Sequence, residues 1–160
     1  MKPLTPMLWF NGEAEEAMNL YTSLFPDSKV LGVMRAPKGT PGMKDGQVLT
    51  ASFRINGTEF TALNGGPQFK FNESVSFVIH CDTQEEVDKY WSALTKDGGE
   101  ESACGWLKDK FGLSWQVTPN YLIEKLQDKD SKKSGAVMQA MLQMRKIDIA
   151  TLKRAYEGAS

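Results

Sequence analysis

The residue types that most often carry chemistry are sparse in this sequence. Its two cysteines, Cys81 and Cys104, fit neither zinc nor redox spacings, so we expect both to be reduced, buried and structural. The single histidine, His80, ends an apolar run, where a structural or surface position is expected. The serines of the predicted strands have no evident His–Asp partners, so nucleophilic catalysis has no support.

Three carboxylates, Glu59, Glu73 and Asp109, are the candidates for acid–base chemistry. None falls at the centre of a strand that would face a cavity. We therefore expect each of them to be a solvated surface group.

The stretch L-N-G-G-P-Q-F-K-F, residues 63–71, is the segment that could cradle a phosphate or an adenosyl methyl donor. Such cradles need a helix directly after the glycines, so that its N–H groups point at the anion. Here Pro67 and two phenylalanines follow, and no helical pattern begins. We interpret the stretch as a junction between two parts of the chain, in which Asn64 is the residue that could touch a ligand.

Composition indicates an ordinary globular domain. Of 160 residues, 41% are hydrophobic and 24% are charged, and the formal net charge is −1. This balance predicts no partnership with nucleic acid or with a membrane surface. The N-terminus lacks the pattern of a secretion signal, and no apolar run is long enough to span a bilayer. Together with reduced cysteines, these features favour a cytoplasmic protein.

The elements that would position a site follow from the hydrophobic pattern. It predicts a strand at 4–10, a helix at about 13–25, and strands at 29–35, 48–55 and 58–63. The order then repeats, with a strand at 74–81, a helix opened by a Thr83–Glu86 capping box, and strands at about 101–104, 106–109 and 114–118. We therefore predict an α+β fold made of two βαβββ modules, residues 1–66 and 72–118.

Residues 119–160 are predicted to be a helical extension within the same single domain, 1–160. Pro119 suits a helix start, and Asp148 suits the cap of a last helix. Between them, residues 131–145 carry an apolar stripe that we expect to be packed inward. Its members are Val137, Met138, Met141 and Leu142.

Several segments together resemble the PhnB-like proteins of the vicinal oxygen chelate superfamily, which includes glyoxalase I, bleomycin-resistance proteins and extradiol dioxygenases. The segments are L-W-F-N-G-x-A-E-E-A-M-N-x-Y, F-P-D-S, A-L-N-G-G-P-x-F-K-F, C-G-W-L-K-D-K-F-G-L-S-W-Q-V and M-Q-A-M-L-x-M-x-K-I-D-I, spread over nearly the whole chain. The resemblance implies two modules that close a half-barrel around a cavity, and a homodimer. Many relatives carry the label 3-demethylubiquinone-9 3-methyltransferase.

Enzymes of that superfamily hold a divalent metal with His, Gln or Glu from the first and last strand of each module. Carried over by strand position, the set here is Thr5, Ala62 or Asn64, Ser76 and Gln116. Neutral hydroxyls and amides are poor metal ligands, so we predict no metal and no other cofactor. The methyltransferase label is not supported by any cofactor motif.

The resemblance and the strand pattern together predict a small-molecule pocket lined by aromatic and neutral polar groups. Its predicted residues are Thr5, Met7, Trp9, Asn64, Phe69, Ser76, Val78, Trp106 and Gln116. The leading hypothesis is a metal-free binding protein, with no catalytic residue assigned. Two alternatives stay open: an enzyme of glyoxalase or dioxygenase type with a weakly held metal, and a structural or regulatory homodimer whose cavity is filled.

Overall fold

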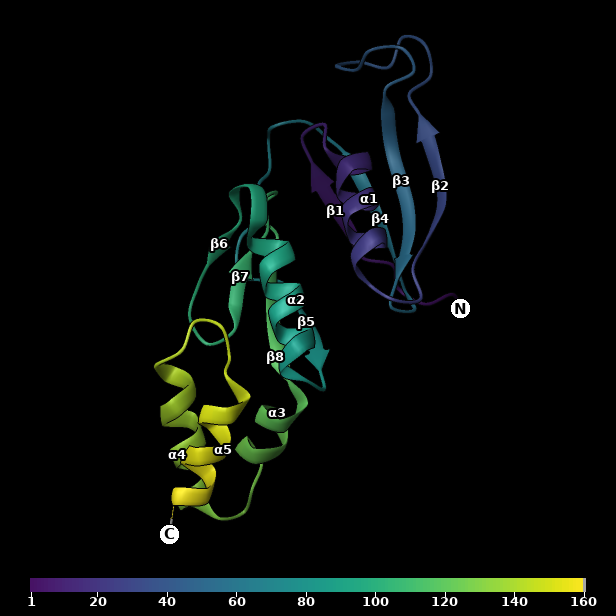
Figure 1. Ribbon diagram of the computed structural model, residues 1–160. Helices are drawn as coiled ribbons and strands as arrows, with labels where there is room; N and C mark the ends of the chain where they lie inside the picture. The colour runs from purple at the N-terminus through teal and green to yellow at the C-terminus, as the bar shows by residue number, and fades with distance from the viewer. Residues whose placement is uncertain (160) are drawn as a thin grey trace. The chain divides into compact units, whose positions relative to one another are not determined.

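The computed structural model describes residues 1–159, which form two compact units, residues 1–71 and the part from Asn72 onward (Figure 1). Each unit is built on its own four-stranded mixed sheet with one helix packed against it. The predicted α+β class and the predicted repeat of two βαβββ modules are confirmed.

The first unit contains β1 (Met7–Phe10), α1 (Ala14–Leu24), β2 (Lys29–Arg35), β3 (Val48–Ile55) and β4 (Thr58–Asn64). The strand order is β1-β4-β3-β2, with β1 parallel to β4 and the other pairs antiparallel. The apolar stripe of α1 covers one face of this sheet, as the periodicity predicts. Its buried members are Ala14, Ala17, Met18, Tyr21 and Leu24.

The second unit repeats this order with β5 (Ser76–Cys81), α2 (Gln84–Thr95), a 3-10 turn η1 (Lys96–Gly98), β6 (Glu100–Glu101), β7 (Trp106–Lys108) and β8 (Ser114–Pro119). The strand order β5-β8-β7-β6 corresponds position by position to that of the first sheet. Thr83 caps α2 by accepting from the Glu86 N–H at 3.2 Å, as predicted.

The C-terminal extension forms a small helical layer of its own with α3 (Asn120–Leu126), α4 (Ser131–Leu142) and α5 (Ile149–Gly158). Asp148 caps α5 as expected, by accepting from the Thr151 N–H. The core of the layer is Leu122, Val137, Ile147 and Leu152. The predicted stripe on α4 is wrong in part, because Met138 and Leu142 are 40% and 50% exposed.

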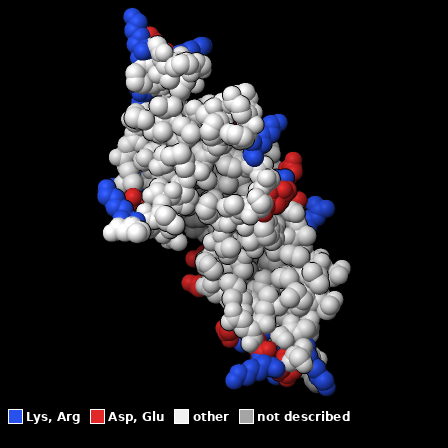
Figure 2. All heavy atoms as spheres, turned by 180° about the vertical axis from the view of Figure 1, so that it is seen from behind, with Lys and Arg blue, Asp and Glu red and all other residues white. Residues whose placement is uncertain are grey.

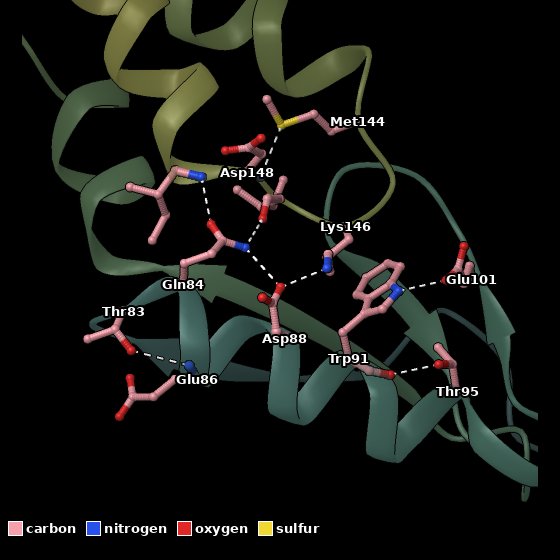
Figure 3. Close-up of polar contacts among 12 residues, drawn as sticks. Thr83, Gln84, Glu86, Asp88, Trp91, Thr95, Glu101, Met144, Lys146 and Asp148 are labelled. Carbon is pink, nitrogen blue, oxygen red and sulfur yellow. Dashed lines mark hydrogen bonds and ion pairs between the residues drawn. The ribbon is translucent and has the colours of Figure 1, made fainter.

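Gln84 on α2 holds this extension against the sheet of the second unit (Figure 3). Its amide donates to the Ile147 carbonyl at 3.0 Å and accepts from the Ile149 N–H at 2.9 Å. Lys146 lies nearby and pairs with Asp88 of α2 at 2.7 Å. The extension is therefore attached through its 146–149 connection rather than through helix faces alone.

The turn between β6 and β7 supplies the second attachment, and here the sequence-based prediction fails. A strand was expected at 101–104, but Cys104 and Gly105 have left-handed backbones, with φ 58° and 84°, so the chain turns. The N–H groups of these two residues donate to the carbonyls of Met144 and Arg145, both at 2.8 Å.

No helix among residues 1–159 is long and apolar enough to cross a membrane.

Candidate functional site

In the first unit, the predicted residues Met7 and Trp9 alternate with the buried Leu8 and Phe10, so they lie on the sheet face opposite α1. Met7 is 61% exposed, and Trp9 is half-buried. Thr5 precedes β1 and is exposed at the surface. Phe69 is 65% exposed and meets the Trp9 ring edge-on, at a centroid distance of 4.9 Å.

Trp9 is fixed in place by the glycine-rich stretch. Its indole Nε1–H donates to the Gly66 carbonyl at 2.9 Å. A Cβ at Gly65 would lie 2.4 Å from the Trp9 ring, so only glycine allows this approach. The stretch therefore serves as a support for Trp9, and no helix follows it before β5.

Asn64, the residue expected to touch a ligand, makes hydrogen bonds within the fold and also lines the cavity described below. Its side chain is 7% exposed and lies on the face covered by α1. The Oδ1 atom accepts from the N–H groups of Gly12 and Ala14, both at 3.0 Å, and Nδ2 donates to the Val48 carbonyl at 2.9 Å. The Asn64 side chain thus joins the start of α1 to β3, and these three hydrogen bonds stabilise the first unit.

A cavity of about 530 Å³ lies at the end of the first sheet. Its walls come from the turn before α1, the loop at 40–43 and the stretch 63–68. Gln47, just before β3, and Leu49 of β3 complete the lining. Among the described residues that line it, none carries a charged side chain. The volume falls in the range of small-molecule sites, about 300–1,000 Å³.

In the second unit, the predicted residues again share the face opposite the helix. Ser76 and Val78 of β5 alternate with the buried Ile79 and Cys81, and His80 is exposed on the same side. Register places Val78 beside Gln116 of β8, and Gln116 beside Trp106 of β7. The Gln116 amide donates to the Ser76 hydroxyl at 2.9 Å, so these two residues are brought together as expected.

The acidic candidates separate into two kinds. Glu59 and Glu73 are exposed, as predicted. Asp109 is 2% exposed, so its prediction as a surface group is wrong. Its carboxylate accepts from the N–H groups of Phe111 and Leu113 and from the Trp115 indole at 2.9–3.1 Å, which makes it the centre of the β7–β8 turn.

Lys108 of β7, which pairs with Ser114 of β8, forms an ion pair with Glu73. Lys108 Nζ lies 2.6 Å from Glu73 Oε1. The hydrogen bond from Lys108 lowers the pKa of the Glu73 carboxyl, and the same bond raises the pKa of the Lys108 ammonium.

Cys81 is fully buried, and desolvation raises its thiol pKa to about 12.

The model of one protein family, 3-demethylubiquinone-9 3-methyltransferase, matches residues 2–118, which span both βαβββ modules. The chain belongs to this family. The match ends with β8, so α3–α5 lie outside it, contrary to the expectation that the resemblance covers nearly the whole sequence. No curated protein matches the chain.

Solved structures agree with membership of the PhnB family. A PhnB protein from Bacillus cereus is 37% identical, with a TM-score of 0.67, covering 74% of this chain and 99% of its own. Protein PA1353 from Pseudomonas aeruginosa is 20% identical, with a TM-score of 0.59, covering 74% and 98%. The fosfomycin resistance protein FosX from Listeria monocytogenes shares the fold, with a TM-score of 0.53 and 17% identity. The match covers 79% of this chain and 98% of the FosX chain.

The residues of this PhnB-family chain do not fit the metal that the superfamily implies. The Ser76 hydroxyl and the Gln116 amide are bonded to each other, and neither carries charge. Within residues 1–159, no three His, Cys, Asp or Glu side chains group in a way that could hold a metal ion. The absence of metal stays a prediction for the protein in solution.

They also do not fit the methyl donor that the family description implies. The glycines at 65 and 66 lead to Pro67 and then to β5 without a helix, so no N-terminal N–H groups point at a bound cofactor.

Figure 2 shows one face of the molecule, on which positive and negative side chains lie in small groups amid uncharged surface.

Proposed function

We propose that this PhnB-family protein binds a small, uncharged molecule without a metal, in the cavity at the end of the first sheet. The observation that supports this is a ligand-sized space of about 530 Å³ whose described lining is uncharged. Such a lining selects through shape and a few hydrogen bonds, because a charged ligand would lose its hydration without gaining a partner.

The lining offers both kinds of contact that such a ligand needs. Leu49, Leu63 and Met43 supply apolar surface, while Gln68 and Thr40 supply neutral polar groups. The loop at 40–43 is one wall, and two exposed glycines with left-handed backbones, Gly39 and Gly42, lie directly before it and within it. We expect this wall to adjust around the ligand, because loops of this kind are more mobile than the sheet.

A thermal-shift screen of neutral aromatic and heterocyclic metabolites tests the proposal. A ligand at 100 times its dissociation constant adds about 2.7 kcal/mol to the free energy of unfolding. Met43→Trp fills the cavity and should remove the shift. Met138→Trp, at an exposed position on α4, is the matched control and should keep it. Equal shifts in both variants would place the ligand elsewhere.

Elemental analysis of the purified protein tests the metal-free part of the proposal. We expect no stoichiometric divalent metal, because the available groups are neutral. One tightly held metal per chain would contradict the proposal and favour the enzyme alternative.

We also propose that the protein forms a homodimer through β2. All seven residues of this edge strand are exposed, and Val30, Leu31, Val33 and Met34 are 39–53% exposed on its two faces. Its outer backbone edge has no paired strand in the described chain, and an apolar edge of this kind favours pairing with another copy. Sedimentation should show a dimer for the wild type and a monomer for Val33→Lys. A monomeric wild type would overturn this.

A further inference from the structure

The second unit contains a buried hydroxyl group that the fold leaves unsatisfied. Ser114, at the start of β8, is 1% exposed. Within residues 1–159, its Oγ atom has no hydrogen-bond partner. An unpaired buried hydroxyl destabilises the fold, so such an atom usually has a partner, which can be an ordered water or a ligand.

Ser114 lines a small pocket of about 130 Å³, together with Glu73, Trp106 and Lys108. This space exceeds the volume of a few water molecules, each about 30 Å³ in the liquid, so it can hold one polar group of a ligand. The pocket shares no lining residue with the uncharged cavity of the first unit.

Sheet register places two hydrogen-bond donors of this pocket, Ser114 and Lys108, side by side, with Ser76 beyond Ser114 and outside the pocket lining. Ser76 of β5 pairs with Ser114 of β8, and Ser114 pairs with Lys108 of β7. Cross-strand neighbours on one face have Cβ atoms about 5 Å apart. An ammonium and a hydroxyl at that spacing can bind the two oxygens of one carboxylate.

Of these two donors, the Lys108 ammonium is already paired with a carboxylate of the chain, that of Glu73. Glu73 contacts Lys108 at 2.6 Å, yet its side chain is 62% exposed and that of Lys108 is 34% exposed. Exposed ion pairs of this kind are weak, so another carboxylate can replace Glu73 at little cost. The released Glu73 side chain would simply extend into water.

Two further carboxylates limit the charge of the ligand. Glu100, opposite Lys108 on β6, and Glu101 also line the pocket. Glu101 accepts from the Trp91 indole at 2.8 Å (Figure 3), which holds it in place. Replacement of Glu73 by one carboxylate leaves the local charge unchanged, whereas a phosphate dianion would add charge beside two acids.

We propose that this pocket is a subsite for the carboxylate of a small monocarboxylic acid, which replaces Glu73 on Lys108 and accepts a hydrogen bond from the Ser114 hydroxyl. The subsite does not depend on the function proposed for the first-unit cavity. A single ligand need not engage both.

Acetate is the probe, with chloride and inorganic phosphate at matched ionic strength as comparisons. Amide NMR shifts of residues 73–76, 108 and 114 should saturate with acetate. Glu73→Gln removes the competing carboxylate and should tighten acetate binding about tenfold. Glu59→Gln, which breaks the similarly exposed Arg54–Glu59 pair, is the matched control and should leave it unchanged.

Two variants separate a binding role from a structural one. Lys108→Met should abolish acetate binding. Ser114→Ala should weaken acetate binding severalfold while raising the unfolding midpoint, because it removes an unsatisfied hydroxyl. Absence of saturable acetate shifts in Glu73→Gln, tighter binding of phosphate than of acetate, or unchanged acetate binding in Ser114→Ala would each overturn the proposal.

Discussion

The indole Nε1–H of Trp9 donates to the carbonyl oxygen of Gly66 at 2.9 Å, and the Trp9 ring fills the space that a side chain at Gly65 would need. This relationship couples an aromatic residue of β1 to the stretch that lines the first-unit cavity.

Gly65→Ala should therefore displace the Trp9 ring. We expect a loss of about 1–3 kcal/mol in the free energy of unfolding, the usual cost of overpacking, and a change in tryptophan fluorescence. Gly135→Ala on α4 is the control, because a Cβ there meets nothing within 4 Å. Equal stability of the two variants would show that the Trp9–Gly66 contact is loose.

Asn64→Ala should cost at least about 2 kcal/mol, because it leaves the N–H groups of Gly12 and Ala14 and the Val48 carbonyl without their partner. Urea unfolding measures the loss. Asn19→Ala, at an exposed position on α1, should change stability by less than about 0.5 kcal/mol. A stabilised Asn64→Ala protein would contradict the structural role of this side chain.

Asp109→Ala should destabilise the second unit by at least about 2 kcal/mol, because two buried donors and the partly buried Phe111 N–H lose their acceptor. The near-ultraviolet circular dichroism of Trp115 should change as well. Glu59→Ala removes only an exposed pair with Arg54, so we expect a change below about 1 kcal/mol. Similar losses from both substitutions would be the contrary result.

The contact between α2 and the C-terminal extension should weaken at low pH. Hydrogen bonds from Lys146 and Gln84 lower the pKa of Asp88 below its usual 3.8. Its contribution is therefore present above about pH 4 and lost as the pH falls through the lowered value. Protection from hydrogen exchange at residues 146–149, corrected for the intrinsic exchange rate at each pH, should fall over that range in the wild type, and be lower but less pH-dependent in Asp88→Asn. Protection that does not change with pH in the wild type would refute this.

The two thiols should differ in reactivity. Burial and the nearby carboxylates of Glu86 and Asp82 raise the pKa of Cys81 to about 12, so it should resist thiol reagents in the native state. Cys104 is half-buried and should be the one that reacts. The reagent should therefore count one thiol per native chain and two in urea, and Cys104→Ser should leave none in the native protein.

The same shift at Cys81 makes the stability of the fold depend on alkaline pH. The unfolded thiol ionises near its ordinary pKa of 9.0, whereas the buried thiol does so only near 12. Since the unfolded state binds fewer protons in this range, the free energy of unfolding should fall as pH rises from about 9 toward 12. Cys81→Ala should remove this part of the decline, and an identical decline would rule it out.

Local sequence signals predicted most of the fold. The helical stripes of α1 and α2 and the caps at Thr83 and Asp148 depend on neighbours in sequence, and all are found. The repeat of βαβββ order followed directly from these elements.

The site was less predictable, because the roles of its residues depend on partners far away in sequence. Asn64 forms hydrogen bonds with Gly12 and Val48, and no local sequence pattern predicts these contacts. The buried role of Asp109 could have been recognised, because the residue precedes a turn at Phe111–Gly112 and its partner Trp115 lies on the next strand. Its charge alone, however, suggested a surface position. Exposure of Met138 and Leu142 depends on how three helices pack, which a single stripe does not specify.

The polar contacts between the extension beyond β8 and the second module include two backbone N–H groups, Gln84, a hydrogen bond from Asn120 to Asp82 and one exposed ion pair. Main-chain groups are present whatever the sequence, so few substitutions in the module are needed to accept such an appendage. In evolutionary terms, we expect its presence to vary among family members more readily than the sheet does. Gln84 would then mark the sequences that carry it.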